Sequence, residues 1–422
     1  MRVLWITNLP LHSMKKNDFE KSIITTQSWL TALKDEMINK AEIELGIATI
    51  MENPQSYKVQ EGNIVHYAIK SSLKSRLHYP MPKTIKKEWT KIIEDFNPDI
   101  IHYHGTEFSH GLTLHEIYPN IPSVLSIQGL TTIIERHYYA NISPYELLKR
   151  KTLYNLIFGG IPQKKKEFLK RGIYEREFIQ SVKNVVGRTD WDKSFVKSLN
   201  PKVNYFHCEE AMRSDFFRVK WDIKEIKRYT IFTPASYNPI KGFHFLLEAV
   251  AILREKYPKI KLRVMGPNIT KSSTIKEKLL QTDYALYLRD IIKKHDLGSN
   301  IEFLGPLSSN QIAREMKSSH TVVVPSAIEN GCNVLAEAML IGVPSVASSA
   351  GGMTTTLKHD MQGYSYNYTE IEMLAYYVSK IWSNDSIALR FSEAARKSSV
   401  DRYNPKNVCL ETFEIYMKLL NE

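Results

Sequence analysis

Short apolar runs alternate with amphipathic stretches along almost the whole chain. In the first half, the runs predicted to be strands are Val3–Thr7, Glu44–Ile50, Asn63–Ala68, Ile100–His104, Ser123–Gln128 and Asn184–Arg188. In the second half, they are Thr230–Ala235, Lys261–Met265, Ile301–Phe303, Thr321–Pro325 and Ser345–Ser348. The predicted helices between them include Phe19–Glu36, Lys83–Phe96, Gly242–Lys256, Thr274–His295, Ser309–Ser318, Asn333–Ile341 and Glu370–Trp382. Because most strands are apolar throughout, the pattern predicts an α/β fold whose parallel sheets are covered on both faces.

The alternation restarts near residue 229, after the polar stretch Asp215–Arg228. We therefore expect two doubly wound, Rossmann-like domains, at residues 1–215 and 229–400, and a last helix over residues 405–422. Ligands of open α/β sheets bind beyond the carboxyl ends of the strands. Two such domains facing a cleft are expected to hold the ligand in that cleft.

Composition narrows the class of protein only modestly. The chain has 422 residues and a formal net charge of +12, with three scattered cysteines. An odd, scattered set of cysteines argues against a disulfide framework and for a reducing compartment. The first apolar run, Val3 to Ile6, is too short for a signal peptide, and no run reaches the length of a membrane span. We expect a cytoplasmic protein.

Much of the positive charge lies in residues 149–176, which contain nine lysines and arginines and only two acids. Apolar residues such as Leu153, Ile157 and Phe158 are interspersed among them. A segment of this kind suits an anionic membrane surface, and also nucleic acid or an acidic substrate. The alternative is a solvated pair of basic helices that binds no partner. Of the binding partners, we expect the inner membrane face and no nucleic acid.

The most informative motif follows the strand Thr321–Val324. Glu329 comes just before a predicted helix, and Glu337 lies eight positions later, inside it. Asn330 is a candidate N-cap, while Gly342 and Pro344 mark the end of the helix. A helix N-terminus offers free N–H groups and partial positive charge, which suit a phosphate, and ionised carboxylates accept hydrogen bonds from sugar hydroxyls.

Two further loops follow strands and carry chemistry of the same type. Lys241 comes after the strand Thr230–Ala235, where an ammonium group could stabilise the negative charge that develops on a departing diphosphate. Gly351 and Gly352 follow the strand Ser345–Ser348, and paired glycines allow backbone amides to approach a ligand closely.

Together these pieces resemble the retaining glycosyltransferases of the GT-B fold, in the group 1 family (carbohydrate-active glycosyltransferase family four), of the bacterial surface-polysaccharide type. The matching pieces are Lys241-Gly242, Val264-Met265-Gly266-Pro267, Ile301 to Gly305, Pro325-Ser326, Glu329 to Glu337, Gly342-Val343-Pro344 and Gly351-Gly352. They occur in family order over residues 230–365. The resemblance implies two Rossmann-like domains facing a cleft, with the terminal helix crossing back to the first domain.

The resemblance also assigns roles to residues of the second half. Glu337 would bind the nucleotide ribose, Glu329 would face the donor sugar, and Lys241 would hold the diphosphate. The other implied contacts to the nucleotide sugar are Ser236, Gly266, Pro267, Asn330, Gly331, Cys332, Asn333 and Val334. The family usually has an arginine where this chain has Ser236. Arg188 is our candidate for the missing positive charge.

In the first half, His104, Gly105 and Gln128 match the acceptor side of the family's site. Many members have a histidine where this chain has Gln128, which forms hydrogen bonds but cannot act as an acid or base. This agrees with the family's proposed route, in which the leaving phosphate takes the acceptor proton. Asp190-Trp191-Asp192 imitates the D-x-D metal motif of another glycosyltransferase fold, but the remaining motifs imply a site that needs no metal and no cofactor.

We therefore expect a retaining, metal-independent hexosyltransferase whose domains close on a nucleotide sugar and a glycan or lipid-linked acceptor, in surface polysaccharide synthesis. One alternative is a GT-B enzyme of other chemistry, such as a nucleotide-sugar epimerase or a phosphorylase. The other is a non-catalytic module that binds sugar or nucleic acid, which gives no reason for the two glutamates at the start of a helix.

Overall fold

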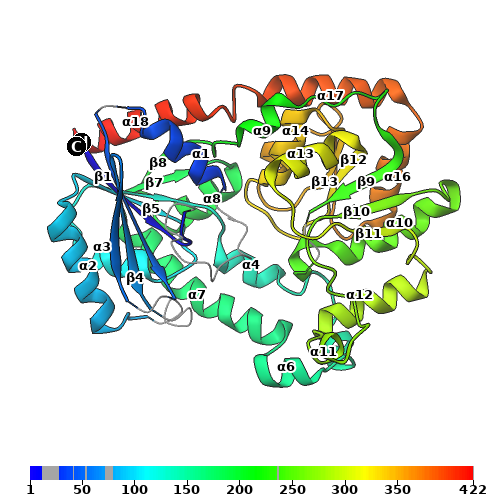
Figure 1. Ribbon diagram of the computed structural model, residues 1–422, viewed down its shortest axis with the longest axis horizontal. Coiled ribbons are helices and arrows are strands. Elements are labelled where there is room, and N and C mark those ends of the chain that lie inside the picture. Colours follow the sequence, from blue (N-terminus) through cyan, green and yellow to red (C-terminus); the bar gives the residue numbers. More distant parts are fainter. Residues whose placement is uncertain (12–27, 41, 53–54, 72–78, 235–236, 422) are drawn as a thin grey trace. The chain divides into compact units, whose positions relative to one another are not determined.

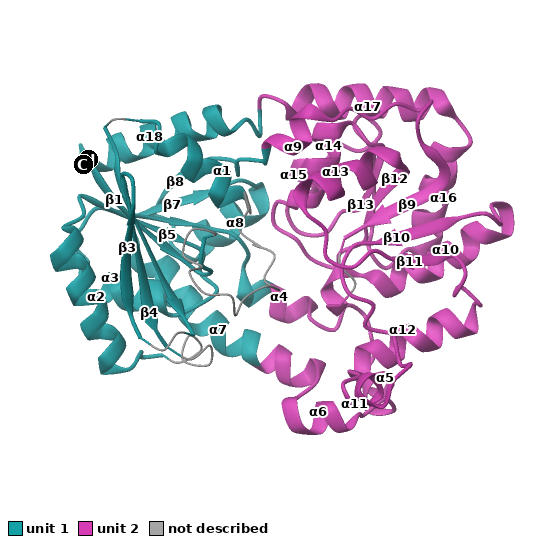
Figure 2. Cartoon of the chain, in the orientation of Figure 1, with its two compact units in different colours: residues 1–133, 167–213, 402–422 teal, residues 134–166, 214–401 magenta. Residues whose placement is uncertain are grey.

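The computed structural model describes residues 1–11, 28–40, 42–52, 55–71, 79–234 and 237–421, and the chain within them divides into two compact units (Figures 1 and 2). Unit 1 comprises residues 1–133, 167–213 and 402–422. Unit 2 comprises residues 134–166 and 214–401. Each unit contains one sheet with helices packed against it, as the apolar pattern predicts.

The sheet of unit 1 has eight strands in the order β3-β4-β2-β1-β5-β6-β7-β8. All neighbouring pairs are parallel except β3 and β4, which are antiparallel. The strands are β1 (Arg2–Thr7), β2 (Glu44–Met51), β3 (Tyr57–Glu61), β4 (Ile64–Lys70), β5 (Ile100–His104), β6 (Ser123–Ser126), β7 (Asn184–Gly187) and β8 (Asn204–His207). The helices are α1 (Ser28–Met37), α2 (Lys83–Phe96), α3 (His110–Ile117), α8 (Asp190–Leu199) and α18 (Pro405–Leu420), with α4 (Thr131–His137) and α7 (Ile161–Ser181) crossing the unit boundaries.

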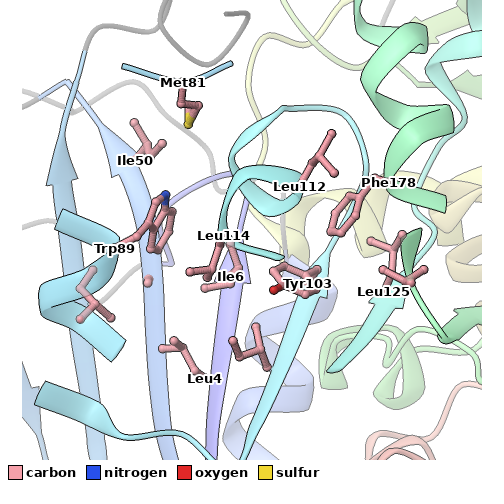
Figure 3. Close-up of a cluster of buried hydrophobic side chains, with 14 of the residues drawn as sticks. Leu4, Ile6, Ile50, Met81, Trp89, Tyr103, Leu112, Leu114, Leu125 and Phe178 are labelled. Carbon is pink, nitrogen blue, oxygen red and sulfur yellow. The ribbon is translucent and has the colours of Figure 1, made fainter. Parts of the chain in front are cut away.

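Side chains of β1 show how this sheet is buried on both faces. Leu4 and Ile6 point into one hydrophobic layer, where α2, α3 and α7 contribute Trp89, Leu112 and Phe178 (Figure 3). The alternate residues of β1 point into a second layer, which α1 and α18 cover. The indole of Trp5 donates a hydrogen bond of 2.9 Å to the hydroxyl of Tyr416 on α18, which ties the terminal helix to the sheet.

The sheet of unit 2 has six parallel strands in the order β11-β10-β9-β12-β13-β14. They are β9 (Lys227–Thr233), β10 (Lys261–Val264), β11 (Ile301–Phe303), β12 (Ser319–Val324), β13 (Ser345–Ser348) and β14 (Tyr364–Tyr366). The helices are α5 (Pro144–Leu148), α6 (Leu153–Phe158), α9 (Ser214–Arg218), α10 (Phe243–Lys256), α11 (Ile275–Leu279), α12 (Asp283–Lys294), α13 (Ser309–Ser318), α14 (Asn333–Ile341), α15 (Met353–Thr356), α16 (Ile371–Trp382) and α17 (Asp385–Ser399).

Three features differ from the pattern-based expectations. The expected helix Thr274–His295 is two helices, α11 and α12, because Thr282 caps the second by accepting the amide of Ala285 at 3.1 Å. The short strands β3, β8 and β14 were not expected. Residues 134–166 cluster with unit 2 rather than within an unbroken first domain, because Arg150 pairs with Asp290 of α12 at 2.7 Å.

Candidate functional site

Three loops of unit 2 meet at the carboxyl ends of β9, β12 and β13, which are neighbours in the sheet. The amide of Ala327, after β12, donates to the carbonyl of Ile240, after β9, at 2.7 Å. The amide of Gly352, after β13, donates to the carbonyl of Glu329 at 2.9 Å. These backbone bonds hold the lysine loop, the glutamate loop and the paired-glycine loop together.

Two glycines make this close approach possible. Gly242 has φ +68°, and a Cβ there would lie 1.9 Å from the carbonyl oxygen of Pro325. Gly351 has φ +64°, and a Cβ there would lie 2.0 Å from the carbonyl oxygen of Glu329. Both positions need the left-handed conformation and the space that only glycine provides.

Lys241 and Glu329, both predicted to be site residues, form an ion pair in this structure. The Lys241 Nζ lies 2.6 Å from Glu329 Oε1, which also accepts the Ser326 hydroxyl at 2.9 Å. The two side chains keep 34% and 16% of their surface exposed, so a ligand can reach them. Burial alone would lower the pKa of Lys241, but the Glu329 carboxylate outweighs it and the pKa is raised. The site therefore holds a permanent cation beside an acceptor of hydroxyl hydrogen bonds.

Helix α14 begins two residues later than the N-cap prediction requires. The residue before its first turn is Cys332, which makes no side-chain cap, so the prediction that Asn330 is the N-cap is wrong. The physical reason is tertiary: Glu329 is held by the Gly352 amide, which keeps the following residues out of the helix. The prediction that Gly342 ends the helix is confirmed by its φ of +83°.

The start of α14 supplies the backbone donors that the motif predicts. Its first N–H groups have no partner within the helix, as at any helix N-terminus. Glu337 lies on the same helix and is almost fully buried, as is Cys332. Burial raises the pKa of the Cys332 thiol to about 12, so it stays protonated and does not act as a nucleophile. Asn333 and Val334 form the first turn.

The other predicted contacts to the nucleotide sugar fall around this centre. Gly266 follows β10 with φ +107°, and its amide donates to the carbonyl of Gly305 at 2.9 Å; Pro267 comes next. Gly331 lies in the loop before α14. Ser236 lies outside the described residues, so its role stays a prediction.

The predicted acceptor-side residues lie at the strand ends of unit 1. His104 ends β5 and is buried. The centroid of its ring lies 3.8 Å from that of His102 and 4.8 Å from that of Trp5. Burial holds the pKa of His104 well below its usual value, so this imidazole is neutral. The amide of Gly105 donates to Ser126 at 3.0 Å, which brings the loop after β5 beside the strand that precedes Gln128.

Arg188, our candidate for the missing charge, is buried in unit 1. Its guanidinium lies 2.5 Å from Glu210 Oε2, and its side chain is 8% exposed. Burial would lower the pKa of Arg188, but the carboxylates of Glu210 and Glu209 raise it. The charge is thus balanced inside unit 1, which gives no support for a role on the diphosphate.

The Asp190-Trp191-Asp192 triplet is the first turn of α8. Thr189 caps this helix by accepting the Asp192 amide at 3.1 Å, and the Asp192 carboxylate accepts the Arg188 amide at 3.1 Å. The triplet therefore has a structural function. In the described part of the chain there is no group of three or more His, Cys, Asp and Glu residues that could hold a metal ion.

Two acids at the strand ends of unit 1 are not predicted by the sequence pattern. The buried carboxylate of Glu175, on α7, accepts the amides of Thr131 and Thr132, both at 2.8 Å, and the hydroxyl of Thr106 at 2.7 Å. It thereby joins the loop after β5 to the start of α4, three residues beyond Gln128. The available signal was its position between the buried apolar residues Tyr174 and Phe178, in a basic segment expected either to bind an anionic surface or to face solvent.

Glu107, the second missed acid, follows β5. Its Oε2 accepts the Asn8 side-chain amide at 2.5 Å. Burial raises the pKa of this carboxyl to about 7, although Arg171 and the Asn8 bond oppose the shift. Glu107 is therefore a titratable group at the strand ends of unit 1, close to the residues expected to face the acceptor.

Replacing Glu175 with alanine is expected to destabilise unit 1 by roughly 2–3 kcal/mol, because two amides and a hydroxyl lose a charged acceptor and stay buried. Thermal unfolding should then begin several degrees lower. Glu175→Gln keeps an acceptor oxygen in the same place and should lose about half as much. Equal melting temperatures for Glu175→Ala and the unchanged protein would contradict the anchoring role.

Comparison with known proteins finds a family match in the second half of the chain. Residues 214–398 match the family described as Glycosyl transferases group 1. The glycosyltransferase MJ1607 of Methanocaldococcus jannaschii is 26% identical over 176 residues, 42% of this chain and 41% of that protein. The matched region thus spans less than half the length of this curated relative.

Solved structures extend the likeness to the whole chain. Sucrose-phosphate synthase from Thermosynechococcus elongatus aligns with a TM-score of 0.73 and 12% identity, over 100% of this chain and 99% of that one. Anabaena HepE, in complex with UDP-glucose, aligns with a TM-score of 0.67 and 15% identity, over 99% and 100%. Identities this low show a shared fold only. The chain therefore has the GT-B fold, with two Rossmann-like units, and its residues 214–398 are similar to the Glycosyl transferases group 1 family.

Proposed function

We propose that this protein is a retaining glycosyltransferase, which moves a sugar from a nucleotide-diphosphate sugar to a glycan or lipid-linked acceptor in surface polysaccharide synthesis. The observation that carries the proposal is the meeting of Lys241, Glu329 and the start of α14 at one edge of the unit 2 sheet. A sugar diphosphate needs a cation, backbone donors and a carboxylate, and this edge holds all three.

In this mechanism, the Lys241 ammonium leaves Glu329 and binds the diphosphate. It stabilises the negative charge that grows as the bond between the anomeric carbon and the phosphate oxygen breaks. The amides at the start of α14 add to this effect. Glu329, released from Lys241, accepts hydrogen bonds from donor-sugar hydroxyls, and Glu337 accepts them from the ribose. Because Lys241 supplies positive charge at the phosphates, we propose that no metal is needed.

The acceptor side of the proposal uses unit 1. The departing phosphate oxygen takes the proton of the acceptor hydroxyl while that hydroxyl oxygen attacks the same face of the sugar. Gln128 contributes a hydrogen bond and no proton transfer. The outcome is retention of configuration at the anomeric carbon.

A donor screen tests the proposal directly. Thermal shift against UDP-, GDP- and ADP-sugars identifies the donor, since binding to the native state raises the melting temperature. UDP-glucose is the first choice, because HepE, which shares the fold, was crystallised with it. Release of nucleotide diphosphate only when acceptor is present supports a transferase. Release without acceptor, or interconversion of two nucleotide sugars, would instead support an epimerase or a hydrolytic enzyme.

Replacing Glu337 with alanine is expected to weaken binding of the donor nucleotide by roughly 10- to 100-fold, because a carboxylate bond to ribose hydroxyls contributes about 1.5–3 kcal/mol. Calorimetric titration with the nucleotide diphosphate measures this. Glu337→Gln, which keeps the size and one acceptor oxygen, should lose less. Unchanged nucleotide affinity in Glu337→Ala would show that the ribose binds elsewhere.

A further inference from the structure

Helix α6 exposes apolar side chains that a water-facing surface does not explain. None of its six residues is buried, and Leu153, Leu156, Ile157 and Phe158 keep 57–68% of their surface exposed. Tyr145 and Leu148 of the preceding α5 are exposed to a similar extent. Large contiguous apolar surface on a folded protein marks a site of interaction.

A second segment of unit 2 adds to this surface. Ile275, Leu279 and Leu280, on and just after α11, are 51–79% exposed. Asp283, four residues beyond Leu279, accepts the amide of Ile161 at 3.3 Å and donates its own amide to Asn155 of α6 at 3.3 Å. These bonds place the end of α6 against the segment that leads out of α11, and Figure 1 shows the two helices in the same region. We call the exposed apolar residues of α5, α6 and α11 the apolar patch.

Exposed lysines lie in and next to the segments that form the apolar patch, whereas Glu146 and Glu277 are paired. The exposed lysines are Lys149, Lys151, Lys164, Lys166, Lys276 and Lys278. Glu146 pairs with Arg150 at 2.6 Å and with Lys149 at 3.5 Å. Glu277 pairs with Lys271 at 3.1 Å and accepts the amide of Thr274 at 3.0 Å. The field around the apolar side chains is therefore positive.

We propose that the apolar patch binds the surface of an anionic phospholipid bilayer. Leucine, isoleucine and phenylalanine side chains enter the boundary between headgroups and acyl chains, and the surrounding lysines contact the headgroup phosphates. The positive charge of these lysines complements an anionic leaflet. A nucleic acid would use the lysines but gives no reason for apolar side chains this exposed. In the described part of the chain no helix is long and apolar enough to cross a membrane, so the contact is interfacial.

The structure also changes which residues carry this contact. The sequence placed the basic segment at residues 149–176, but Arg171 donates to the carbonyl of Glu107 at 2.7 Å and Glu175 is the buried anchor described above. The proposed contact keeps α6 and the lysines near it, which lie inside that segment, and adds α5 and α11, of which α11 lies more than a hundred residues away in sequence.

A groove in unit 2 links the membrane contact to the binding of an acceptor. This link rests on the proposed function. The groove has a volume of about 660 Å³ and is lined by Tyr154 and Phe158 of α6, and by Asn238 and Pro239, which precede Lys241. The groove therefore joins side chains of α6, at the proposed bilayer contact, to residues just before Lys241, as a lipid-linked acceptor requires.

Sedimentation of the full chain with vesicles tests the proposal without any sugar donor, so its result is independent of the transferase assignment. We expect at least tenfold tighter binding to phosphatidylcholine vesicles containing about 30% phosphatidylglycerol than to phosphatidylcholine alone. The double variant Leu156→Ser, Ile157→Ser should lose at least tenfold in binding, and Lys151→Glu should lose about fivefold.

Leu389→Ser is the matched control, because this leucine of α17 is 49% exposed yet lies outside the apolar patch. It should bind vesicles as the unchanged protein does. All of these positions are exposed, so melting temperatures should agree within about 1 °C. Equal binding to neutral and anionic vesicles, undiminished binding by the double variant, or binding of single-stranded RNA in place of vesicles would each overturn the proposal.

Discussion

Replacing Lys241 with alanine is expected to lower the turnover number for glycosyl transfer by about 10²- to 10³-fold, while the KM for acceptor changes little. Lys241 is the cation that the structure places beside the predicted donor-sugar carboxylate, 2.6 Å from Glu329. Its charge acts on the departing diphosphate and not on the acceptor, so the loss should appear in the chemical step. Steady-state kinetics with the donor found by thermal shift measures both constants.

Because Lys241 also neutralises Glu329, the single variant changes two things at once. The double variant Lys241→Ala, Glu329→Gln removes the unpaired carboxylate as well. Its melting temperature should therefore lie closer to that of the unchanged protein than the melting temperature of Lys241→Ala does. If turnover stays low in the double variant, the lysine charge is needed for the leaving group. Recovery of turnover to near normal would show that Lys241 only balances Glu329, and would refute its catalytic role.

The pattern of apolar and polar residues was sufficient to predict helices and strands that depend only on nearby residues. Helix α14 ends where predicted, at Ile341, because its apolar run is followed by Gly342, which can adopt the left-handed conformation. The parallel sheets follow from strands that are apolar throughout, as β1 illustrates by feeding alternate side chains into two buried layers. Family motifs over residues 230–365 agree with the match to residues 214–398.

The features that the sequence pattern did not predict depend on contacts between residues distant in sequence. Asn330 is a residue type that often caps helices, but the hydrogen bond from the Gly352 amide to the Glu329 carbonyl decides where the helix begins. Lys241 and Glu329 are 88 positions apart, and they meet because β9 and β12 are neighbours in the sheet. Glu175 looked like one acid in a solvated basic helix, although it accepts three hydrogen bonds from residues more than forty positions away.

The domain boundary illustrates the same limit. Polar residues before residue 229 mark the start of the second repeat, and unit 2 begins nearby, at Ser214. The basic stretch at residues 149–176 crosses the boundary at residue 166 and does not mark it. Residues 134–166 join unit 2 through contacts such as the one from His244 to the carbonyl of Ala140, at 2.9 Å. The exposed apolar side chains of α6 could likewise not be separated from buried ones by sequence alone, since LYNLIF is apolar enough for a core.

Replacing Gly242 with alanine is expected to have the largest effect on stability. The new Cβ would lie 1.9 Å from the carbonyl oxygen of Pro325, so the backbone of either the lysine loop or the glutamate loop must move. The left-handed conformation adds about 1–2 kcal/mol for a residue with a side chain, and overpacking adds about 1–3 kcal/mol. We expect a loss of roughly 4 kcal/mol and a melting temperature lower by about 10 °C.

Alanine substitutions at two other glycines separate the effect of backbone strain from that of a steric clash. Gly305 also has positive φ, +69°, but a Cβ there would meet nothing within 4 Å, so Gly305→Ala should cost only about 1–2 kcal/mol. Gly298 has open space and no strained φ, so Gly298→Ala should be neutral or slightly stabilising. Gly242→Ala should also abolish donor binding, since Lys241 is its neighbour, whereas the other two variants should bind donor normally. If Gly242→Ala melts like Gly305→Ala and binds donor, then the contact between the two loops does not hold the site together.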